Sequence, residues 1–166
     1  MTTRALAELE STTAHKPAVL WVDDNPDDLL LFQLAWEKAQ VTNPVRCTTC
    51  RKEAMDYLEG RGKFSDRDAF PLPCVIVIDM CLPDGKASDF LRWIRAHPAF
   101  KKLVVIVLSG TANQEEVNEA YRSGANSFLL KSPNPRHLHT TVRLIQSYWL
   151  TRNSLPKTPA SASQPL

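Results

Sequence analysis

Four apolar runs in this chain each end in a polar or charged side chain. Their bounds, with the residues that follow them, are 18–22 before Asp23-Asp24, 74–78 before Asp79, 103–108 before Ser109, and 127–130 before Lys131. Short runs of this kind, rich in β-branched residues, predict strands buried on both faces of a parallel sheet. Open α/β sheets bind ligands at the carboxyl ends of their strands, so these polar residues mark a candidate site.

Between these runs, apolar residues recur at helical spacing. The pattern predicts a weaker strand over residues 44–48 and helices over 27–39, from 53, from 88 to His97-Pro98, over 114–123 and over 136–150. Asn25 and Gly124 are residue types expected at a helix start and a helix end. This alternation predicts a flavodoxin-like α/β fold: a doubly wound, five-stranded parallel sheet of order 2-1-3-4-5 with helices on both faces.

The first and last of these helices carry apolar residues at a spacing that indicates one buried face. The residues expected to be buried are Leu30, Leu31, Leu34 and Ala35 in the first helix, and Leu138, Val142, Ile145 and Trp149 in the last. The apolar face of each of these two helices is expected to pack against the sheet.

The assumed strand order gathers the polar residues into one place. The strands over 18–22, 74–78, 103–108 and 127–130 become successive neighbours in the sheet. Their carboxyl ends then bring Asp24, Asp79, Ser109 and Lys131 to one edge, in that order.

Composition limits the class of protein. The chain has 166 residues, of which 43% are apolar and 23% charged, and a net charge of +2, as in an ordinary globular protein. The balanced charge gives no field directed at nucleic acid or a membrane, and no apolar stretch approaches the roughly 20 residues of a membrane span. Residues 1–16 lack the apolar core of a secretory signal. We therefore expect a cytoplasmic protein whose four cysteines are free thiols.

Polar and proline-rich segments set the expected domain limits. Residues 1–16 are expected to form a flexible arm, residues 17–150 one domain, and residues 151–166 a disordered tail rich in Pro, Ser and Thr. The tail is too short for a DNA-binding or catalytic domain, so any output is expected to pass by contact with another protein.

The candidate site has the groups that phosphoryl transfer needs. The carboxylates of Asp23, Asp24 and Asp79 repel one another unless a cation intervenes, and an oxygen-only cluster suits Mg²⁺ better than zinc. A carboxylate can attack phosphorus and form an aspartyl-phosphate. The Lys131 ammonium and the Ser109 hydroxyl can then stabilise the phosphoryl oxygens.

Taken in order, these residues resemble the response-regulator receiver domain over residues 18–150. The matching features are Asp23-Asp24, Asp79 with Pro83 four residues later, Ser109-Gly110, and Lys131. The resemblance implies that Asp79 is the phosphoacceptor and that Mg²⁺ is held by the acidic pair, Asp79 and the main-chain carbonyl of Cys81. It also implies that Ser109 and Lys131 assist the transfer and that Ser109 and Phe128 act as switch residues.

Within this family the chain is similar to the single-domain regulators found beside bacterial phytochromes. The segments that carry this similarity are Asp24-Asn25-Pro26-Asp27-Asp28, Arg61-Gly62-Lys63-Phe64, Gly124-Ala125-Asn126-Ser127 and Tyr148-Trp149-Leu150. Two positions depart from the family pattern. Ser132 separates Lys131 from Pro133, so the usual cis bond after the lysine cannot be assumed, and Ala87 stands where a glycine is usual. Neither departure removes a reactive group.

The resemblance implies a phosphorylation-controlled switch in a two-component phosphorelay. Its chemistry would be limited to Mg²⁺-dependent self-phosphorylation and dephosphorylation, without enzymatic turnover. The expected partners are a downstream protein target and a phosphoryl donor, either a phosphotransfer protein or a sensor histidine kinase, for which a bacterial phytochrome is a candidate. The face formed by residues 114–123, 127–130 and 136–150 is expected to change on phosphorylation and is a candidate homodimer surface.

Two alternatives from other classes stay open. One is a receiver-fold scaffold that is never phosphorylated. The other is a phosphohydrolase with an aspartyl-phosphate intermediate, which would typically need a second acid where Cys81 stands.

Further residues with reactive side chains have simpler interpretations. Cys47-Thr48-Thr49-Cys50 has the spacing of a redox motif but lacks the aromatic and Gly-Pro surroundings of thioredoxin-like sites. His137 and His139 lie two residues apart on the predicted last helix, so they point to different faces and are expected to be surface residues.

Overall fold

The computed structural model describes residues 16–132 and 134–156 of the chain. Residues 1–15 of the expected arm and 157–166 of the expected tail lie outside these ranges. The expected domain limits therefore stay a prediction.

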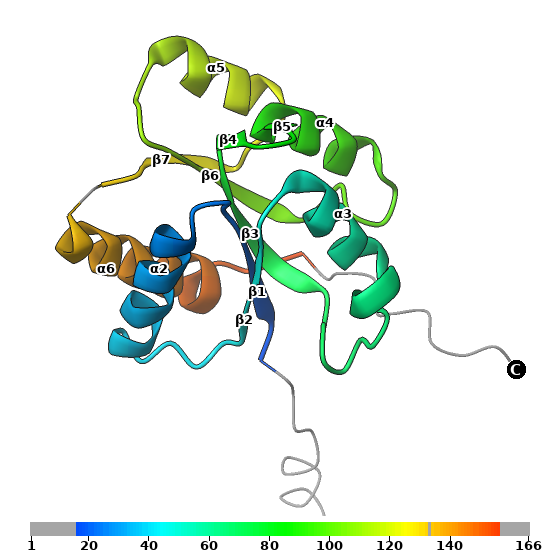
Figure 1. Ribbon diagram of the computed structural model, residues 1–166, viewed down its shortest axis with the longest axis horizontal. Helices are drawn as coiled ribbons and strands as arrows, with labels where there is room; N and C mark the ends of the chain where they lie inside the picture. The colour runs from blue at the N-terminus through cyan, green and yellow to red at the C-terminus, as the bar shows by residue number, and fades with distance from the viewer. Residues whose placement is uncertain (1–15, 133, 157–166) are drawn as a thin grey trace, which may run out of the picture.

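Five parallel strands form the central sheet, in the order β2-β1-β3-β6-β7 (Figure 1). The strands are β1 (Ala18–Val22), β2 (Val45–Thr48), β3 (Pro73–Asp79), β6 (Val104–Ser109) and β7 (Ser127–Leu130). Counted along the chain, these five strands run 2-1-3-4-5 across the sheet, which confirms the flavodoxin-like order. The register aligns Val22 with Ile78 and Asp79 with Leu108, so the carboxyl ends of the central strands lie level.

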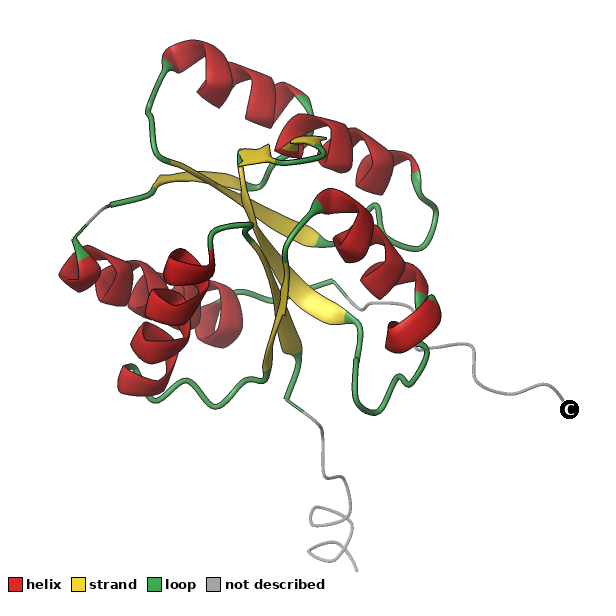
Figure 2. Cartoon of the chain, viewed as in Figure 1, coloured by secondary structure: helices red, strands yellow, loops and turns green. Residues whose placement is uncertain are grey.

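Helices cover both faces of the sheet (Figure 2). They are α2 (Pro26–Lys38), α3 (Arg51–Glu59), α4 (Ala87–Ala96), α5 (Gln114–Arg122) and α6 (Pro135–Leu144), with the 3₁₀ turn η1 (Gly62–Phe64) and the π-helical segment η2 (Ile145–Arg152). Helices α2 and α6 pack on one face, and α3, α4 and α5 on the other. None of the helices in the described ranges has the length and apolar character to cross a membrane.

The start of α2 is fixed directly beside the acidic pair. The Asn25 side-chain oxygen accepts hydrogen bonds from the backbone N–H groups of Asp27 and Asp28 at 2.9 and 3.4 Å. Pro26 occupies the first turn, where its missing N–H has no cost. The expected cap is therefore confirmed, and it places the acidic first turn of α2 at the carboxyl edge of the sheet.

The buried face of α2 differs from the expected one. Of the four residues expected to be buried, Ala35 is buried. The other three side chains are exposed, with exposed fractions of 55% for Leu30, 37% for Leu31 and 53% for Leu34. Phe32 and Trp36 take their place: Phe32 stacks on Trp21 of β1 with ring centroids 3.5 Å apart, and Trp36 lies 5.3 Å from Phe32. Aromatic rings bury more apolar surface than leucines do, so they face the sheet, and the prediction for the three leucines is wrong.

The last helix follows the expected pattern. Val142 and Ile145 are buried in the core that α2 shares with the sheet, and Leu138 and Trp149 pack against it half-buried. Its final π-helical segment continues to Arg152, and Leu155 also packs against this core.

A short hairpin that the sequence did not reveal follows Asp79. Strands β4 (Cys81–Leu82) and β5 (Gly85–Lys86) pair antiparallel and lead into α4. Gly85 has φ +131°, and a Cβ at this position would collide with the Arg51 guanidinium. The turn therefore requires glycine at Gly85, and Ala87 is the first residue of α4.

Candidate functional site

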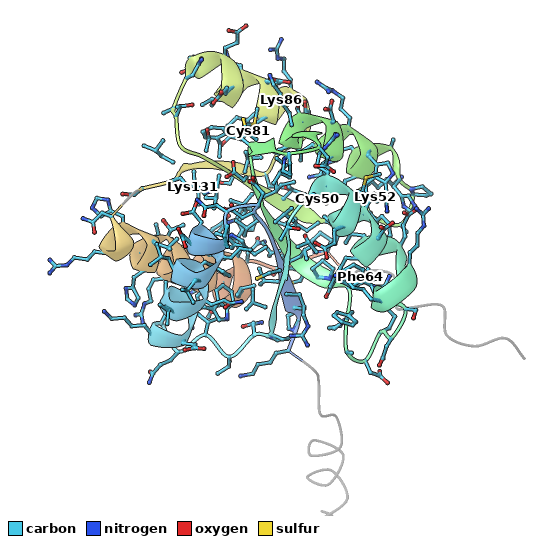
Figure 3. The ribbon with its side chains drawn as sticks, viewed as in Figure 1. Cys50, Lys52, Phe64, Cys81, Lys86 and Lys131 are labelled. Carbon is cyan, nitrogen blue, oxygen red and sulfur yellow. The ribbon has the colours of Figure 1, made fainter. Side chains whose placement is uncertain are left out.

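The carboxyl ends of four strands meet at one edge of the sheet, and the residues expected from the sequence converge there. Asp23 and Asp24 follow β1, Asp79 ends β3, Ser109 ends β6, and Lys131 follows β7. Lys131 and the β4 residue Cys81 can be followed at this edge in Figure 3.

Three carboxylates form the acidic centre of the site. Oxygen atoms of Asp23, Asp24 and Asp79 lie within 4.8 Å of one another. Asp23 is buried, Asp24 is exposed and Asp79 is intermediate. Burial raises the pKa of the Asp23 carboxyl above its ordinary value, even though Lys131 and a backbone amide favour the charged form. Backbone N–H groups also hold the cluster, because that of Asn25 donates to Asp23 Oδ1 at 3.0 Å and that of Cys81 to Asp79 Oδ1 at 3.1 Å.

The Lys131 ammonium already lies among these carboxylates. Its Nζ is 2.5 Å from Asp79 Oδ2, 2.6 Å from Asp23 Oδ2 and 2.8 Å from Asp28 Oδ2. Burial opposes its charged form, but the hydrogen bonds with the three carboxylates outweigh burial and keep the pKa of Lys131 above its ordinary value. The lysine therefore compensates part of the charge of the cluster.

Asp28 is a site residue that the sequence analysis missed as such. It lies in the first turn of α2, and its carboxylate contacts the Lys131 ammonium. The signal was present, because the Asn25 cap places Asp28 in the first turn of a helix that begins directly after the acidic pair.

Ser109 lies at the expected edge, but its hydroxyl is engaged elsewhere. Its Oγ donates to Glu116 Oε2 of α5 at 3.2 Å. The Thr111 hydroxyl donates to the same Glu116 oxygen at 2.7 Å. Within the described residues no hydrogen bond joins the Ser109 side chain to Asp79. Glu116 could not have been chosen from the sequence, because nothing in its spacing distinguishes it from Glu115.

Phe128 lies on β7, half-buried against the core under α5. Its backbone N–H donates to the Tyr121 hydroxyl of α5 at 3.2 Å. The proposed switch role of its ring stays a prediction.

The segment after Lys131 replaces the usual proline with a polar cap. Every described peptide bond is trans, including that between Lys131 and Ser132. The Ser132 hydroxyl lies 2.8 Å from His137 Nδ1 and accepts the Asn134 backbone N–H at 3.2 Å. Ser132 thereby ties the end of β7 to the first turn of α6.

The hairpin that carries Cys81 is fixed from α3. The Asp84 carboxylate accepts the backbone N–H groups of Arg51 and Lys52, at 3.0 and 2.8 Å. Arg51 also donates to the main-chain oxygen of Asp84 and to Asp89. Burial opposes ionisation of Asp84, but these N–H groups and the Arg51 charge prevail and hold the pKa of Asp84 below its ordinary value. The loop after Asp79 is therefore tied down on the side away from Lys131.

The donor set fits a hard divalent cation. All three clustered side chains offer oxygen, the ligand type that Mg²⁺ and Mn²⁺ prefer. Lys131 now contacts two of the three, so a cation and the ammonium must share these oxygens.

The family model of the response regulator receiver domain matches residues 19–143. This chain belongs to that family. Response regulator Rcp1 of Synechocystis sp. is 28% identical over 138 residues, covering 83% of this chain and 92% of Rcp1. The structure of the Mn²⁺-bound form of Rcp1 has a TM-score of 0.74 to this chain, with 85% of this chain and 99% of that one covered.

Two further solved structures are similar over nearly their whole length. Response regulator RPA3017 in red light signaling of R. palustris is 29% identical with a TM-score of 0.81, covering 86% of this chain and 99% of that one. The phosphorylated cyanobacterial phytochrome response regulator RcpA is 30% identical with a TM-score of 0.78, covering 87% and 100%. The expected fold, the receiver family and the likeness to phytochrome response regulators are confirmed. The chain is thus a receiver domain of the two-component response regulators, a family of signalling proteins and not of turnover enzymes.

Proposed function

We propose that Asp79 accepts a phosphoryl group from a phosphohistidine, and that the receiver domain then signals by contact with other proteins. The observation that supports this most directly is the position of Asp79. Its carboxylate lies at the open edge of the sheet, inside a carboxylate cluster, with an ammonium 2.5 Å from one oxygen.

The reaction follows from these groups. An Asp79 carboxylate oxygen attacks the phosphorus, the phosphorus–nitrogen bond to the donor imidazole breaks, and its electron pair stays on that nitrogen. Lys131 offsets the charge that gathers on the phosphoryl oxygens. The Ser109 hydroxyl, at the end of the neighbouring strand β6, donates a hydrogen bond to one of these oxygens after leaving Glu116.

Mg²⁺ is the proposed cofactor. Asp24 and Asp79 would hold it directly, with Asp23 acting through water and the Cys81 main-chain carbonyl as a further ligand. The bound cation would supply charge neutralisation of the transferred group. Support comes from the oxygen-only donor set and from the Mn²⁺-bound form of the relative Rcp1.

The proposed donor is a sensor histidine kinase, with a bacterial phytochrome as the candidate, or a phosphotransfer protein. The relatives in red light signaling and the phytochrome response regulator RcpA support this choice. The proposed output surface is the face of α5, β7 and α6, where Tyr121 is 50% and Leu130 54% exposed. The same face is our candidate for a homodimer and for binding the downstream target.

Acetyl phosphate with Mg²⁺ tests the proposal. We expect the wild-type chain to gain one slowly lost phosphoryl group by intact mass spectrometry and Asp79→Asn to gain none, because an amide is not nucleophilic enough. Asp27→Asn is the matched control, since Asp27 is an exposed acid near the site and should label normally.

The other outcomes distinguish the alternatives. Rapid turnover of small phosphate esters would favour the phosphohydrolase. Absence of any label from acetyl phosphate and from a phosphorylated kinase would favour the scaffold. Label that persists in Asp79→Asn would assign the acceptor to another residue.

A further inference from the structure

The hydroxyl of Ser109 is held by a residue outside the acidic cluster. Ser109 is buried at the end of β6, and its Oγ donates to Glu116 Oε2 at 3.2 Å while accepting the Thr111 backbone N–H at 3.2 Å. Thr111 Oγ1 donates to the same Glu116 oxygen at 2.7 Å. One half-buried carboxylate of α5 thus accepts from the hydroxyl at the end of β6 and from the Thr111 hydroxyl of the loop that follows.

The simplest explanation for a glutamate at this place is helix capping. Glu116 occupies the third position of α5, where a glutamate commonly reaches back to the backbone N–H of the cap residue. Here the cap is Asn113, whose side chain accepts the Glu115 N–H. The Glu116 carboxylate instead reaches the two hydroxyls, so its contacts serve the loop that follows Ser109.

A hydroxyl has one proton to donate. The Ser109 proton cannot be given to Glu116 and to a phosphoryl oxygen on Asp79 at the same time. We propose that Glu116 is a positioning residue that holds the Ser109 hydroxyl in its unphosphorylated arrangement, so that phosphorylation must break this contact. The inference rests on the roles proposed above for Asp79 and Ser109.

Thr111 makes the contact reversible. Its hydroxyl keeps the shorter of the two hydrogen bonds to Glu116, so the carboxylate stays anchored when Ser109 leaves. Loss of the phosphoryl group then lets Ser109 return to a partner that has not moved. Glu116 thereby stabilises the unphosphorylated arrangement of Ser109 relative to the phosphorylated one.

Beryllofluoride, a phosphoryl mimic that forms on aspartate with Mg²⁺, tests this on the full chain. Removal of a hydrogen bond to a charged acceptor should favour the bound arrangement, so Glu116→Ala should bind beryllofluoride roughly tenfold more tightly than wild type. Glu116→Gln keeps an oxygen acceptor without the charge and should gain only about threefold. Glu115→Ala removes the same charge from the same turn and should change the affinity less than about twofold.

A second readout follows the loop itself. In the ligand-free state of Glu116→Ala, the NMR signals of the Ser109 and Thr111 amides should move toward their positions in beryllofluoride-bound wild type. A merely structural glutamate would lower the melting temperature when removed but would move neither these signals nor the affinity in this direction. If Glu116→Ala does not fold, the threefold gain of Glu116→Gln carries the test.

The two levels of the proposal fail separately. A wild-type chain that takes neither beryllofluoride nor acetyl phosphate label would overturn the proposed function. A wild type that binds beryllofluoride, with Glu116→Ala and Glu116→Gln binding no more tightly, would overturn the role of Glu116 alone. An equal gain in Glu115→Ala would assign the effect to general charge and equally reject the specific contact.

Discussion

Lys131 and Ser109 lie at the ends of neighbouring strands near Asp79, but only one of the two side chains already contacts the Asp79 carboxylate. The Lys131 ammonium already lies 2.5 Å from an Asp79 oxygen, whereas the Ser109 hydroxyl is bonded to Glu116. The charge-compensating half of the site is therefore assembled before phosphorylation, and the hydrogen-bonding half is not.

The difference has an electrostatic origin. A cluster of three carboxylates, one of them buried, needs a cation nearby, and Lys131 supplies it. The neutral Ser109 hydroxyl cannot compensate the charge of this cluster. It donates instead to a strong acceptor nearby, the Glu116 carboxylate. In the proposed function, a phosphoryl group on Asp79 would bring additional negative charge, and only then would the site compete for the Ser109 proton.

Removal of Lys131 should have the largest effect. We expect Lys131→Met to slow labelling by acetyl phosphate about 100-fold, because the ammonium no longer stabilises the transferred group. The unfolding free energy in urea without Mg²⁺ should fall by about 2 kcal/mol, since buried Asp23 loses its ion pair. Calorimetry should show tighter Mg²⁺ binding, because Lys131 no longer shares the carboxylate oxygens.

Lys52→Met is the matched control for this variant. Lys52 is exposed and its ammonium pairs with Asp56, away from the acidic cluster, so loss of the ammonium should leave labelling and Mg²⁺ affinity unchanged. Weaker Mg²⁺ binding in Lys131→Met would contradict the view that ammonium and cation share the same oxygens.

Removal of the Ser109 hydroxyl should have a smaller effect on the first step and a clear one on the response. We expect Ser109→Ala to label about fivefold more slowly, because one hydrogen bond from a neutral hydroxyl to the transferred group is lost. Hydrogen exchange over residues 110–117 should no longer respond to phosphorylation. Ser109→Thr keeps the hydroxyl and should retain both properties. A loss in Ser109→Ala as large as in Lys131→Met would show that the hydroxyl half is also preassembled.

The sequence was sufficient to predict the site residues that lie at strand ends. The runs before Asp23, Asp79, Ser109 and Lys131 are local patterns, and a parallel sheet brings their carboxyl ends together whatever the loops do. Glu116 and the β4–β5 hairpin depend on loop geometry, for which no such periodicity exists. The strand-end residues, Ser109 among them, could thus be predicted, whereas the contacts of Lys131 with Asp28 and of Ser109 with Glu116 could not.

The α2 face shows the same limit in the core. Its leucines and its aromatic residues both recur at helical spacing, so periodicity alone allows either face to be buried. The choice is made by Trp21 of β1, whose ring stacks on Phe32. A contact between two elements cannot be found in the pattern of one of them.

Asp28 offers the smallest and most selective test of the assembled half. It contacts the Lys131 ammonium at 2.8 Å, and both side chains line a cavity of about 390 Å³ between α2 and α6 that has room for an amide. Asp28→Asn should slow labelling about twofold, because Lys131 keeps Asp23 and Asp79 as partners and a partly exposed ion pair contributes only about 0.5 kcal/mol.

Asp27→Asn is the control that distinguishes loss of the Asp28–Lys131 ion pair from loss of a negative charge at the start of α2. Asp27 lies in the same first turn of α2 and carries the same charge, but it makes no contact with Lys131 among the described residues. Loss of either acid weakens the interaction with the helix dipole equally, so a twofold slowing confined to Asp28→Asn would assign the effect to the Lys131 contact. Equal slowing in both variants would mean that Lys131 is held by Asp23 and Asp79 alone, and the assembled half of the site would then end at the sheet edge.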